Sequence, residues 1–446
     1  MPQRVVVVGG GAAGMSAASA ARRTDRQASV TVLEQGPYAS YGVCGIPYFL
    51  GGVVPRGEDL IAVPPEDFRA KRDIDLRLRV AVEAIDLDRK LVTTSGAEPL
   101  SFDSLVFAAG AAPIVPDVPG VADRRVVTVR RLEDAMALRQ LLPSIGRAVV
   151  VGAGYVGLEM AEALCEHSIA VTVVDRLSRV MSTVDQTIAS IAEEEVRRHC
   201  DVRLGAELVA IEPGPSSVRV VLSDGSIETD LVVLALGVRP TTSLLTAQGL
   251  TFLPNGALIV DDRLRTSHDA VWAAGDCVAV HHRVLDAPAF VPLGPAANKA
   301  GRVAGISAAG GDSTFAGVVG TAVVKIFDLT IAHSGLTLVD AEAAGLDAVA
   351  TEITAKSRAK YYPGAEPMRV RLIHTRDGRV LGGQLAGRDG AALRVDVIAA
   401  ALHARMSIDD LADLDLAYAP PFSPVYDPLT QAAQAAQFAR MGGGTP

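Results

Sequence analysis

Apolar and glycine-rich segments alternate in a fixed order at the N-terminus of the chain. The apolar residues 5–8 lead into the glycine-rich segment 9–14, an alanine-rich stretch follows, and the apolar residues 30–33 end at Glu34. This order predicts a strand, a tight turn, a helix and a second strand, which together form a βαβ unit. The glycines of such a turn let a pyrophosphate approach the helix N-terminus, and an acidic residue at the end of the second strand accepts a hydrogen bond from a ribose hydroxyl. The residues expected to contact a bound dinucleotide are Gly9, Gly11, Ala12, Ala13, Gly14 and Glu34.

The same order returns in the middle of the chain. The apolar residues 148–151 lead into the segment 152–157, and a second apolar segment, 170–174, ends at Asp175. Two such units predict two different dinucleotides, one a bound flavin and the other an exchangeable nicotinamide. Asp175 favours the free 2′-hydroxyl of NADH over the phosphate of NADPH, while Arg176 beside it leaves NADPH open. The expected contacts of this second site are Gly152, Gly154, Tyr155, Val156, Gly157 and Asp175.

The composition fits a soluble globular enzyme of about three domains. The 446 residues are 49% hydrophobic and 21% charged, which is enough apolar content for several cores. A formal net charge of -9, without a run of lysine or arginine, argues against a nucleic-acid surface. The N-terminus runs directly into an apolar strand without a signal-peptide pattern, and no apolar run is long enough for a membrane span. We therefore expect a cytoplasmic protein that binds neither nucleic acid nor membrane.

Cys44 is the strongest candidate for chemistry outside the glycine-rich segments. It lies in the segment 40–48, and no second cysteine is near it in sequence. Because Pro47 is tolerated only in the first turn of a helix, a helix beginning here would place Cys44 at its positive end, where a thiol pKa is lowered. A lone thiolate stores two electrons either as a sulfenic acid or as a mixed disulfide with an external thiol. The other cysteines have no metal-ligand spacing, so we expect no metal site and expect small buried side chains at Cys165, Cys200 and Cys277.

A third segment resembles a known flavin motif. Residues 266–276 are expected to form a short strand that ends in Gly275-Asp276, and they resemble the second flavin motif of two-dinucleotide flavoproteins, in which the aspartate binds the ribityl chain. This resemblance implies that the N-terminal unit holds FAD and that the nicotinamide unit is inserted into it. The segments 106–110 and 234–237 resemble the crossover strands that bracket such an insertion. The implied boundaries are 1–113 and 259–320 for the FAD-binding domain and 114–258 for the NAD(P)H-binding domain.

Three further motifs connect the whole chain with one family. They are Ser40-x-x-x-Cys44-x-x-Pro47-Tyr48, Tyr361-Tyr362-Pro363-Gly364 and Tyr418-Ala419-Pro420-Pro421-Phe422-Ser423-Pro424. Together with both glycine turns and the Gly-Asp motif, they make the chain resemble the single-cysteine branch of the pyridine nucleotide-disulfide oxidoreductases, and within it the coenzyme A-disulfide reductases. The resemblance implies an α/β fold with two Rossmann-like, glutathione-reductase-like dinucleotide-binding domains. It also implies an α+β dimerisation domain over 321–446 and a homodimer, and the closing residues 442–446 are expected to fray.

The resemblance implies a route for the electrons. NADH binds under Tyr155, a gate over the isoalloxazine, and passes hydride to FAD, which in turn reduces Cys44. The Cys44-S-S-CoA mixed disulfide then releases one coenzyme A thiol, and the regenerated thiolate attacks the next disulfide. Tyr362, and Tyr418 of the partner subunit, are implied to complete the catalytic group. Further cofactor contacts are implied at Val82, Ala109, Gly110, Arg131, Glu159, Gly237, Gly275 and Asp276.

The implied substrate sets its own demands. Coenzyme A carries an ADP 3′-phosphate, so its site needs cations and planar donors along a groove that leads to Cys44. Val43 stands where coenzyme A-disulfide reductases often have asparagine, which weakens the coenzyme A assignment more than it weakens disulfide or polysulfide chemistry. By position in the family pattern, the substrate residues are Arg23, Ser40, Val43, Arg72, Asn298, Tyr361 and Tyr426.

Other reactions use the same framework and stay open. NADH oxidases and NADH peroxidases cycle the lone cysteine through sulfenic acid and typically carry a histidine in the first glycine turn, where this chain has Ala12 and Ala13. A polysulfide or persulfide reductase would use the same mixed-disulfide chemistry, often with an appended sulfur-transfer domain that this sequence does not carry. An electron-transfer flavoprotein would need no thiol chemistry at Cys44. The histidines lie far from the glycine turn in sequence and are expected to be structural or solvated: His281, His282, His333 and His403.

Overall fold

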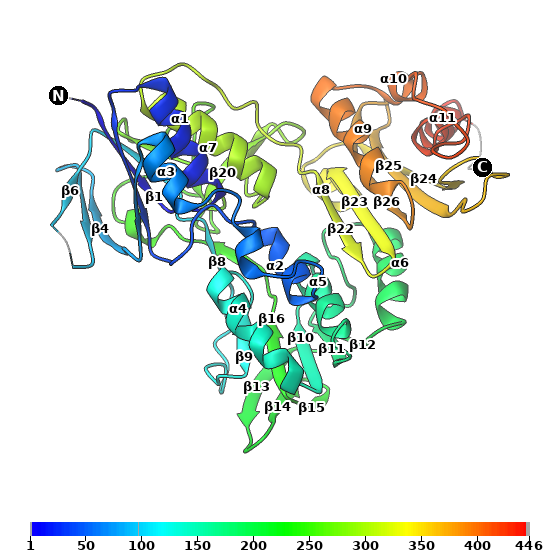
Figure 1. Ribbon diagram of the computed structural model, residues 1–446. Coiled ribbons are helices and arrows are strands. Elements are labelled where there is room, and N and C mark those ends of the chain that lie inside the picture. Colours follow the sequence, from blue (N-terminus) through cyan, green and yellow to red (C-terminus); the bar gives the residue numbers. More distant parts are fainter. Residues whose placement is uncertain (1, 97, 443–446) are drawn as a thin grey trace.

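Three units lie around a common centre in the computed structural model, which describes residues 2–96 and 98–442. In Figure 1 the first is coloured dark blue and yellow-green, the second cyan and green, and the third yellow to red. The expectation that the chain frays at its end concerns residues 443–446, which lie outside the described residues. Within the described part, no helix is both long and apolar enough to cross a membrane.

The first unit is built on a five-stranded parallel sheet in the order β19-β7-β1-β2-β3. Its strands come from the sequence before and after the predicted insertion, because β19 follows the second unit in sequence and still pairs with β7. The strands are β1 (Arg4–Val8), β2 (Ser29–Glu34), β3 (Asp75–Leu78), β7 (Ser104–Phe107) and β19 (Val271–Ala273). Two small sheets adjoin it, made of β4 (Val82–Asp86), β5 (Leu91–Thr94) and β6 (Leu100–Ser101), and of β18 (Leu258–Ile259), β20 (Val278–His282) and β21 (Ala287–Ala289). Its helices are α1 (Ala12–Thr24), α2 (Ile46–Leu50), α3 (Pro65–Arg72) and α7 (Gly294–Ala308).

The second unit repeats this design with the parallel order β12-β11-β10-β16-β9. Its strands are β9 (Val126–Thr128), β10 (Arg147–Val151), β11 (Ala170–Asp175), β12 (Asp201–Leu204) and β16 (Leu231–Leu234). An antiparallel sheet of β13 (Leu208–Pro213), β14 (Val218–Leu222) and β15 (Gly225–Thr229) adjoins it. The helices are α4 (Leu132–Leu141), α5 (Tyr155–Cys165) and α6 (Gln186–Arg197).

A two-stranded ribbon joins the first two units. Strand β8 (Ala111–Pro113) leaves the first unit, β17 (Val238–Pro240) returns to it, and the two pair in antiparallel register. The predicted crossover segments 106–110 and 234–237 lead directly into this ribbon, and the paired strands are the residues that follow them. The domain boundaries themselves stay a prediction.

The third unit is an antiparallel sheet in the order β22-β23-β26-β25-β24, packed against helices. Its strands are β22 (Ala322–Ile326), β23 (Leu329–Gly335), β24 (Ala348–Lys356), β25 (Pro367–Thr375) and β26 (Val380–Gly387). Its helices are α8 (Leu338–Ala343), α9 (Ala391–Ala404), α10 (Ile408–Ala412) and α11 (Pro428–Arg440). Two parallel Rossmann-like units and one α+β unit confirm the predicted fold class.

Glycines on α7 allow it to pack closely against α1. A Cβ on Gly301 would lie 2.2 Å from the carbonyl oxygen of Ala13, and one on Gly305 would lie 2.0 Å from that of Ala17. The helices therefore approach each other through backbone and small side chains alone. This contact fixes α1, which begins at the first glycine turn, onto the part of the first unit that follows the insertion.

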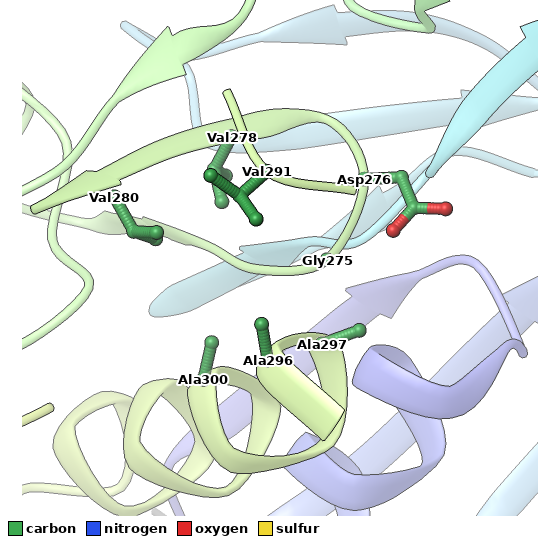
Figure 2. Close-up of a pocket in the computed structure, with 8 residues that line it drawn as sticks. All are labelled: Gly275, Asp276, Val278, Val280, Val291, Ala296, Ala297 and Ala300. Carbon is green, nitrogen blue, oxygen red and sulfur yellow. The ribbon is translucent and has the colours of Figure 1, made fainter. Parts of the chain in front are cut away.

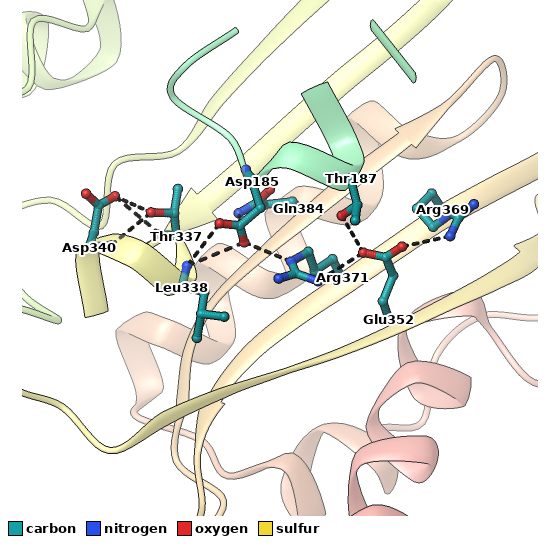
Figure 3. Close-up of polar contacts among 9 residues, drawn as sticks. All are labelled: Asp185, Thr187, Thr337, Leu338, Asp340, Glu352, Arg369, Arg371 and Gln384. Atoms are coloured by element: carbon teal, nitrogen blue, oxygen red, sulfur yellow. Dashed lines mark hydrogen bonds and ion pairs between the residues drawn. The ribbon is translucent and has the colours of Figure 1, made fainter. Parts of the chain in front are cut away.

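Buried charges attach the second unit to the third. Arg371 on β25 pairs with Asp185, just before α6, at 2.8 Å and with Glu352 on β24 at 3.1 Å. Gln384 on β26 donates to the same Asp185 carboxylate at 3.0 Å, and Figure 3 shows this connected network. The hydrophobic core is also continuous here, because Phe327 and neighbouring residues of β22 and β23 pack with the core of the second unit. The second and third units thus form one packed body.

Candidate active site

The first glycine turn is shaped by close backbone approaches. Gly9 has a φ of +105°, and a Cβ there would lie 2.2 Å from the carbonyl oxygen of Ala108. A Cβ on Gly14 would lie 1.9 Å from the carbonyl oxygen of Gly9. Only glycine fits either position without movement of the backbone. Gly11 differs, because among the described residues no atom beyond its own adjoining backbone lies within 4 Å of its Cβ position, so the space beside it is open to a ligand.

The second glycine turn has the same geometry. Gly152 has a φ of +111° and a Cβ position 2.3 Å from the carbonyl oxygen of Ala235, and the Cβ position of Gly157 lies 1.8 Å from the carbonyl oxygen of Gly152. At Gly154 the Cβ position again has no atom of the described chain, beyond the adjoining backbone, within 4 Å. Helices α1 and α5 begin after the open glycines without a side-chain cap. Each turn therefore has the shape and the backbone donors that a pyrophosphate requires.

An acidic side chain closes each turn. Glu34 accepts hydrogen bonds from the backbone N–H groups of Gly10 and Gly36, at 2.6 and 2.7 Å. Asp175 accepts from the backbone N–H groups of Ala153 and Leu177, at 2.7 and 2.8 Å. A carboxylate held by two backbone donors keeps further lone pairs for a ribose hydroxyl.

The Gly275-Asp276 motif faces the N-terminal end of α7. Figure 2 shows Asp276 at one end of a small pocket, with its carboxylate turned away from the apolar side chains. That carboxylate pairs with Arg130 at 2.6 Å, across 146 positions of sequence. The predicted cofactor residue Arg131 instead pairs with Asp134, at 3.0 Å. The other residues that line the pocket are Gly275, Val278, Val280, Val291, Ala296, Ala297 and Ala300.

Cys44 lies where the sequence predicts, immediately before a short helix. It is in the 3-10 turn Val43–Gly45, and α2 follows with Pro47 in its first turn. The apolar face of α2 packs on α5 of the second unit, since Ile46, Phe49 and Leu50 belong to the core of that unit. The thiol therefore sits where the first and second units meet.

The pKa of Cys44 differs from the expectation. The residue as a whole is exposed, yet enough protein surrounds it that desolvation is the largest cause of a raised thiol pKa. The carboxylates of Glu159 and Asp276 raise this pKa further, and Arg130 lowers it. The lowering expected from the helix position is thus wrong for the chain alone, because a helix of 5 residues is outweighed by burial and by two carboxylates.

Glu159 lies on α5 one turn after Tyr155, and it shares the environment of the thiol. Burial raises the pKa of Glu159 to about 7, and Glu162 raises it too, whereas a hydrogen bond with Tyr48 lowers it. Because the charge of Glu159 also raises the pKa of Cys44, the two groups are electrostatically linked. Near neutral pH this carboxyl is able to hold or release a proton beside the thiol.

Tyr155 is the first residue of α5 and has a buried hydroxyl. Burial raises its pKa to about 12, and the Thr183 side chain, which lies near the hydroxyl but outside good hydrogen-bonding geometry, lowers it. Its ring centroid lies 6.2 Å from that of His333, which comes from β23 of the third unit. Burial lowers the pKa of His333 to about 4, so the imidazole is neutral at physiological pH. The sequence did not predict that His333 lies beside Tyr155, because the two residues meet only through packing of the second unit against the third.

The predicted tyrosines lie on the surface of the third unit. The hydroxyls of Tyr361 and Tyr418 are 3.3 Å apart, and the Arg358 guanidinium lies over the Tyr362 ring at 6.0 Å from its centroid. Tyr426 is 62% exposed and follows the same loop toward α11. In Figure 1 the α11 end of the third unit is far from α2, the helix that begins two residues after Cys44. A second chain would have to bring these tyrosines to the thiol.

The other predicted substrate residues border α1. Arg23 is on α1 and exposed, Arg72 donates to the Ser19 hydroxyl at 2.9 Å, and Asn298 accepts from Ser16 at 3.1 Å. The Arg72 guanidinium also lies 4.7 Å above the centroid of the Phe68 ring. Three polar candidates are therefore gathered along one helix. Two further candidates lie in the segment that precedes the thiol: Ser40, in the left-handed region with a φ of 54°, and the half-buried Val43.

The remaining predicted cofactor contacts lie mainly at the carboxyl ends of parallel strands, where open α/β sheets bind ligands. Ala109 and Gly110 follow β7, Gly237 follows β16, Val156 is on the first turn of α5, and Val82 begins β4. No three His, Cys, Asp or Glu side chains of the described residues gather as a metal site.

Known sequences share this arrangement over the whole chain. Residues 3–301 match the family described as pyridine nucleotide-disulphide oxidoreductase, and residues 321–429 match the dimerisation domain of that family. The NAD(P)H coenzyme A polysulfide/persulfide reductase of Pyrococcus horikoshii is 38% identical over 443 residues, which are 98% of this chain and 99% of that protein. The coenzyme A disulfide reductase of Staphylococcus haemolyticus is 29% identical over 412 residues, 90% of this chain and 92% of that protein.

Solved structures have the same fold throughout. Reduced CoADR-RHD of Bacillus anthracis is 33% identical, with a TM-score of 0.95 over 99% of this chain and 81% of that one. The water-forming NADH oxidase of Lactobacillus brevis bound to NADH is 32% identical, with a TM-score of 0.95 over 99% of each chain. The chain belongs to the pyridine nucleotide-disulphide oxidoreductase family. It is an FAD-dependent NAD(P)H oxidoreductase, and its third unit is the family's dimerisation domain.

Proposed function

We propose that this chain reduces coenzyme A disulfide to two coenzyme A thiols through a mixed disulfide at Cys44. The observation that carries the proposal is the position of Cys44, an exposed thiol between two dinucleotide-binding turns. The other cysteines are engaged elsewhere, because Cys277 is fully buried and Cys165 lies 3.5 Å from Cys200. A single thiol in this position exchanges with an external disulfide rather than with a second cysteine of its own.

The thiol exchange balances in two steps. The Cys44 thiolate attacks one sulfur of the substrate, a Cys44–S–S–CoA bond forms, and one coenzyme A thiolate leaves. Two electrons from NAD(P)H then cleave that bond, so the second coenzyme A leaves and Cys44 returns to the thiolate. FAD, when bound, supplies the relay of these two electrons from nicotinamide to sulfur. Glu159, with a pKa of about 7, is placed to hold the proton that a leaving thiolate takes up.

Coenzyme A recognition is proposed along α1. Arg23 and Arg72 supply cations for the phosphates, and Ser40 and Asn298 supply polar contacts on the path toward Cys44. Arg72 is held by Ser19 and stacked on Phe68, so its guanidinium is already oriented. Replacement of Arg72 by alanine should raise KM for coenzyme A disulfide about tenfold and leave KM for NADH unchanged.

We also propose a homodimer in which the third unit of each chain completes the site of the other. Large exposed hydrophobic residues support this, because eleven of the seventeen in the described chain lie in the third unit. They include Tyr361 and Phe422, which are 76% and 77% exposed. Exposed hydrophobic side chains concentrated on one unit are expected at a protein interface.

Mixed dimers test the shared site. Cys44→Ser and Tyr418→Ala homodimers should both be impaired, whereas a hybrid of the two has one site with both native residues. Unfolding and refolding the two variants together, or expressing them together, should therefore restore turnover above either parent. No restoration, with hybrids verified by mass spectrometry, would place both residues in one chain's site.

A second candidate is reduction of a coenzyme A persulfide or polysulfide. The relative of that name is 38% identical to this chain, against 29% for the coenzyme A disulfide reductase. Both reactions would pass through Cys44, so the products separate them. Coenzyme A disulfide should yield two thiols per NADH, whereas a persulfide should yield one thiol and one hydrogen sulfide.

Replacement of the thiol is the direct test of the proposed function. Cys44→Ser should lower disulfide turnover by about 10³-fold or more, while reduction of bound FAD by NADH continues. Cys165→Ser is a matched control, because it removes a thiol at the C-terminal end of α5, away from Cys44. Undiminished disulfide turnover in Cys44→Ser would overturn the proposal and favour direct electron transfer from the flavin.

A further inference from the structure

Two of the cysteines expected to be inert lie together. Cys165 is the last residue of α5, and Cys200 follows α6 just before β12. Their sulfur atoms are 3.5 Å apart, although 35 positions separate them in sequence. Cys165 is half-buried and Cys200 is buried, and neither forms a disulfide.

We propose that Cys165 and Cys200 form a second redox site that closes to a reversible disulfide when the protein meets hydrogen peroxide or a small disulfide. The sulfur atoms need to approach from 3.5 Å to about 2.05 Å, which is a small side-chain movement. The site is separate from Cys44 and does not depend on which substrate Cys44 reduces. Its sequence separation explains why spacing alone did not reveal it.

The two thiols have different roles in this step. The hydrogen bond between them lowers the pKa of Cys165 and raises that of Cys200, which burial raises further. Cys165 is also the more accessible of the two, so it is the attacking thiolate. Cys200 then resolves the oxidised Cys165.

The oxidation balances with either oxidant. With hydrogen peroxide, the Cys165 thiolate takes one oxygen to become a sulfenic acid, and water leaves after protonation. The Cys200 thiol then attacks that sulfur, and a second water leaves as the disulfide forms. With a small disulfide, Cys165 first forms a mixed disulfide and releases one thiol, and Cys200 displaces the other.

The position of the pair connects it to the active site and to the third unit. Helix α5 has Tyr155 and Glu159 at its N-terminal half and Cys165 at its C-terminal end. His199, next to Cys200, stacks on Phe327 of the third unit with ring centroids 3.9 Å apart. The Phe327 backbone N–H in turn donates to Glu162 of α5 at 2.8 Å. The disulfide would therefore link the ends of α5 and α6 where both contact the dimerisation domain.

Mapping of the thiols in the folded, FAD-containing protein tests the site. Cys44→Ser protein is treated with hydrogen peroxide, alkylated after denaturation and digested. One cross-linked peptide pair containing Cys165 and Cys200 should appear, lighter by about 2 Da than the two thiol peptides together, and dithiothreitol should restore both. Wild-type protein with Cys44 first blocked by a removable disulfide reagent is the second preparation, in case the variant folds poorly.

Two variants separate the roles. Cys200→Ser should accumulate a trappable sulfenic acid at Cys165, because the resolving thiol is gone. In Cys165→Ser, Cys200 should remain a thiol after peroxide treatment, because it is buried and has lost its attacking partner. The buried Cys277 should remain a thiol in every sample. Separate alkylation of Cys165 and Cys200 after peroxide treatment, or a disulfide that forms only in denatured protein, would overturn the proposal. Neither result would alter the test of Cys44 described above.

Discussion

The first and second dinucleotide units use the same backbone devices and differ in the helix that follows. A Cβ on Gly9 or Gly152 would lie 2.2 or 2.3 Å from a carbonyl oxygen of the strand end beside it. Gly11 and Gly154 both have open space at the Cβ position. The helix after the first turn, α1, packs through small residues onto α7. The helix after the second turn, α5, carries titratable residues, with Glu159 close to Cys44 and Glu162 at the third unit.

This difference assigns different tasks to the two helices: one suits retention of a bound cofactor, and the other suits exchange of a nucleotide and transfer of a proton. A helix fixed by close backbone contact suits a cofactor that stays bound, whereas a helix with a buried tyrosine and a carboxyl of pKa about 7 suits exchange and proton transfer. Phosphate binding depends on backbone shape, which both units share. The carboxyl that affects the pKa of Cys44 is on the second helix, whereas the thiol itself lies before α2 in the first unit.

The largest expected effect concerns the attachment of the second unit to the third. Arg371→Ala should lower the free energy of unfolding by about 3 to 5 kcal/mol, because it leaves the buried Asp185 carboxylate without its cationic partner, whereas Glu352 keeps Arg369. Urea unfolding followed by circular dichroism measures the change. Arg369→Ala is the matched control, since Arg369 pairs only with Glu352 and its side chain is 40% exposed against 15% for Arg371. Equal losses in the two variants would contradict a special role for the buried network.

Substitution of Gly154 or Gly11, the two glycines with open space at the Cβ position, should impair the binding of one nucleotide and not the other. Gly154→Ala should fold normally, keep its FAD and lower kcat/KM for NADH by about 10- to 100-fold, because the new methyl group meets no protein atom and would meet the pyrophosphate. Gly11→Ala should instead lose FAD during purification. Absorbance of bound flavin and steady-state kinetics distinguish the two. A Gly154→Ala protein with unchanged kinetics would show that nicotinamide does not use this turn.

Glu159 should make stability depend on pH. Its folded pKa of about 7 lies above the ordinary 4.5, so the folded chain holds this proton more tightly than the unfolded chain. The resulting stabilisation is complete below about pH 4.5 and is lost as pH rises through about 7. Between pH 5 and pH 8, wild-type protein should lose about 2 to 3 kcal/mol of unfolding free energy relative to Glu159→Gln. Parallel pH curves for both proteins would contradict the buried state of this carboxyl.

The smallest expected effect concerns the choice of nicotinamide. Arg176 is exposed beside Asp175 and makes no ion pair or side-chain hydrogen bond within residues 2–96 and 98–442. Arg176→Ala should lower kcat/KM for NADPH about threefold and leave that for NADH unchanged, because a solvated cation adds little to phosphate binding. Arg197→Ala, on the exposed face of α6, is a control for nonspecific charge effects. An equal loss with both nucleotides would remove Arg176 from the 2′-phosphate site.

Local patterns predicted the units and their turns, because the information lies within short stretches of sequence. The apolar residues 5–8 and 148–151 became β1 and β10, and Pro47 entered the first turn of α2. The acidic residues at the strand ends were found for the same reason. Each depends on a periodicity or a fixed spacing that is readable without the tertiary fold.

Contacts between distant segments were not predictable in this way. Arg130 reaches Asp276, His333 lies beside Tyr155, and Cys165 meets Cys200, all through packing of separate elements. The pKa of Cys44 was misjudged for the same reason. Local sequence gave its helix position, whereas its surroundings come from α5 and from the Gly-Asp motif.

The mass of the intact protein tests the central claim most directly. Protein incubated with coenzyme A disulfide, without NAD(P)H, is measured under denaturing and nonreducing conditions and again after thiol treatment. The account predicts one coenzyme A adduct per chain, mapped to Cys44, released by thiol and absent in Cys44→Ser. An unmodified or singly oxygenated Cys44 with no coenzyme A released would contradict it and favour peroxide, oxygen or polysulfide reduction.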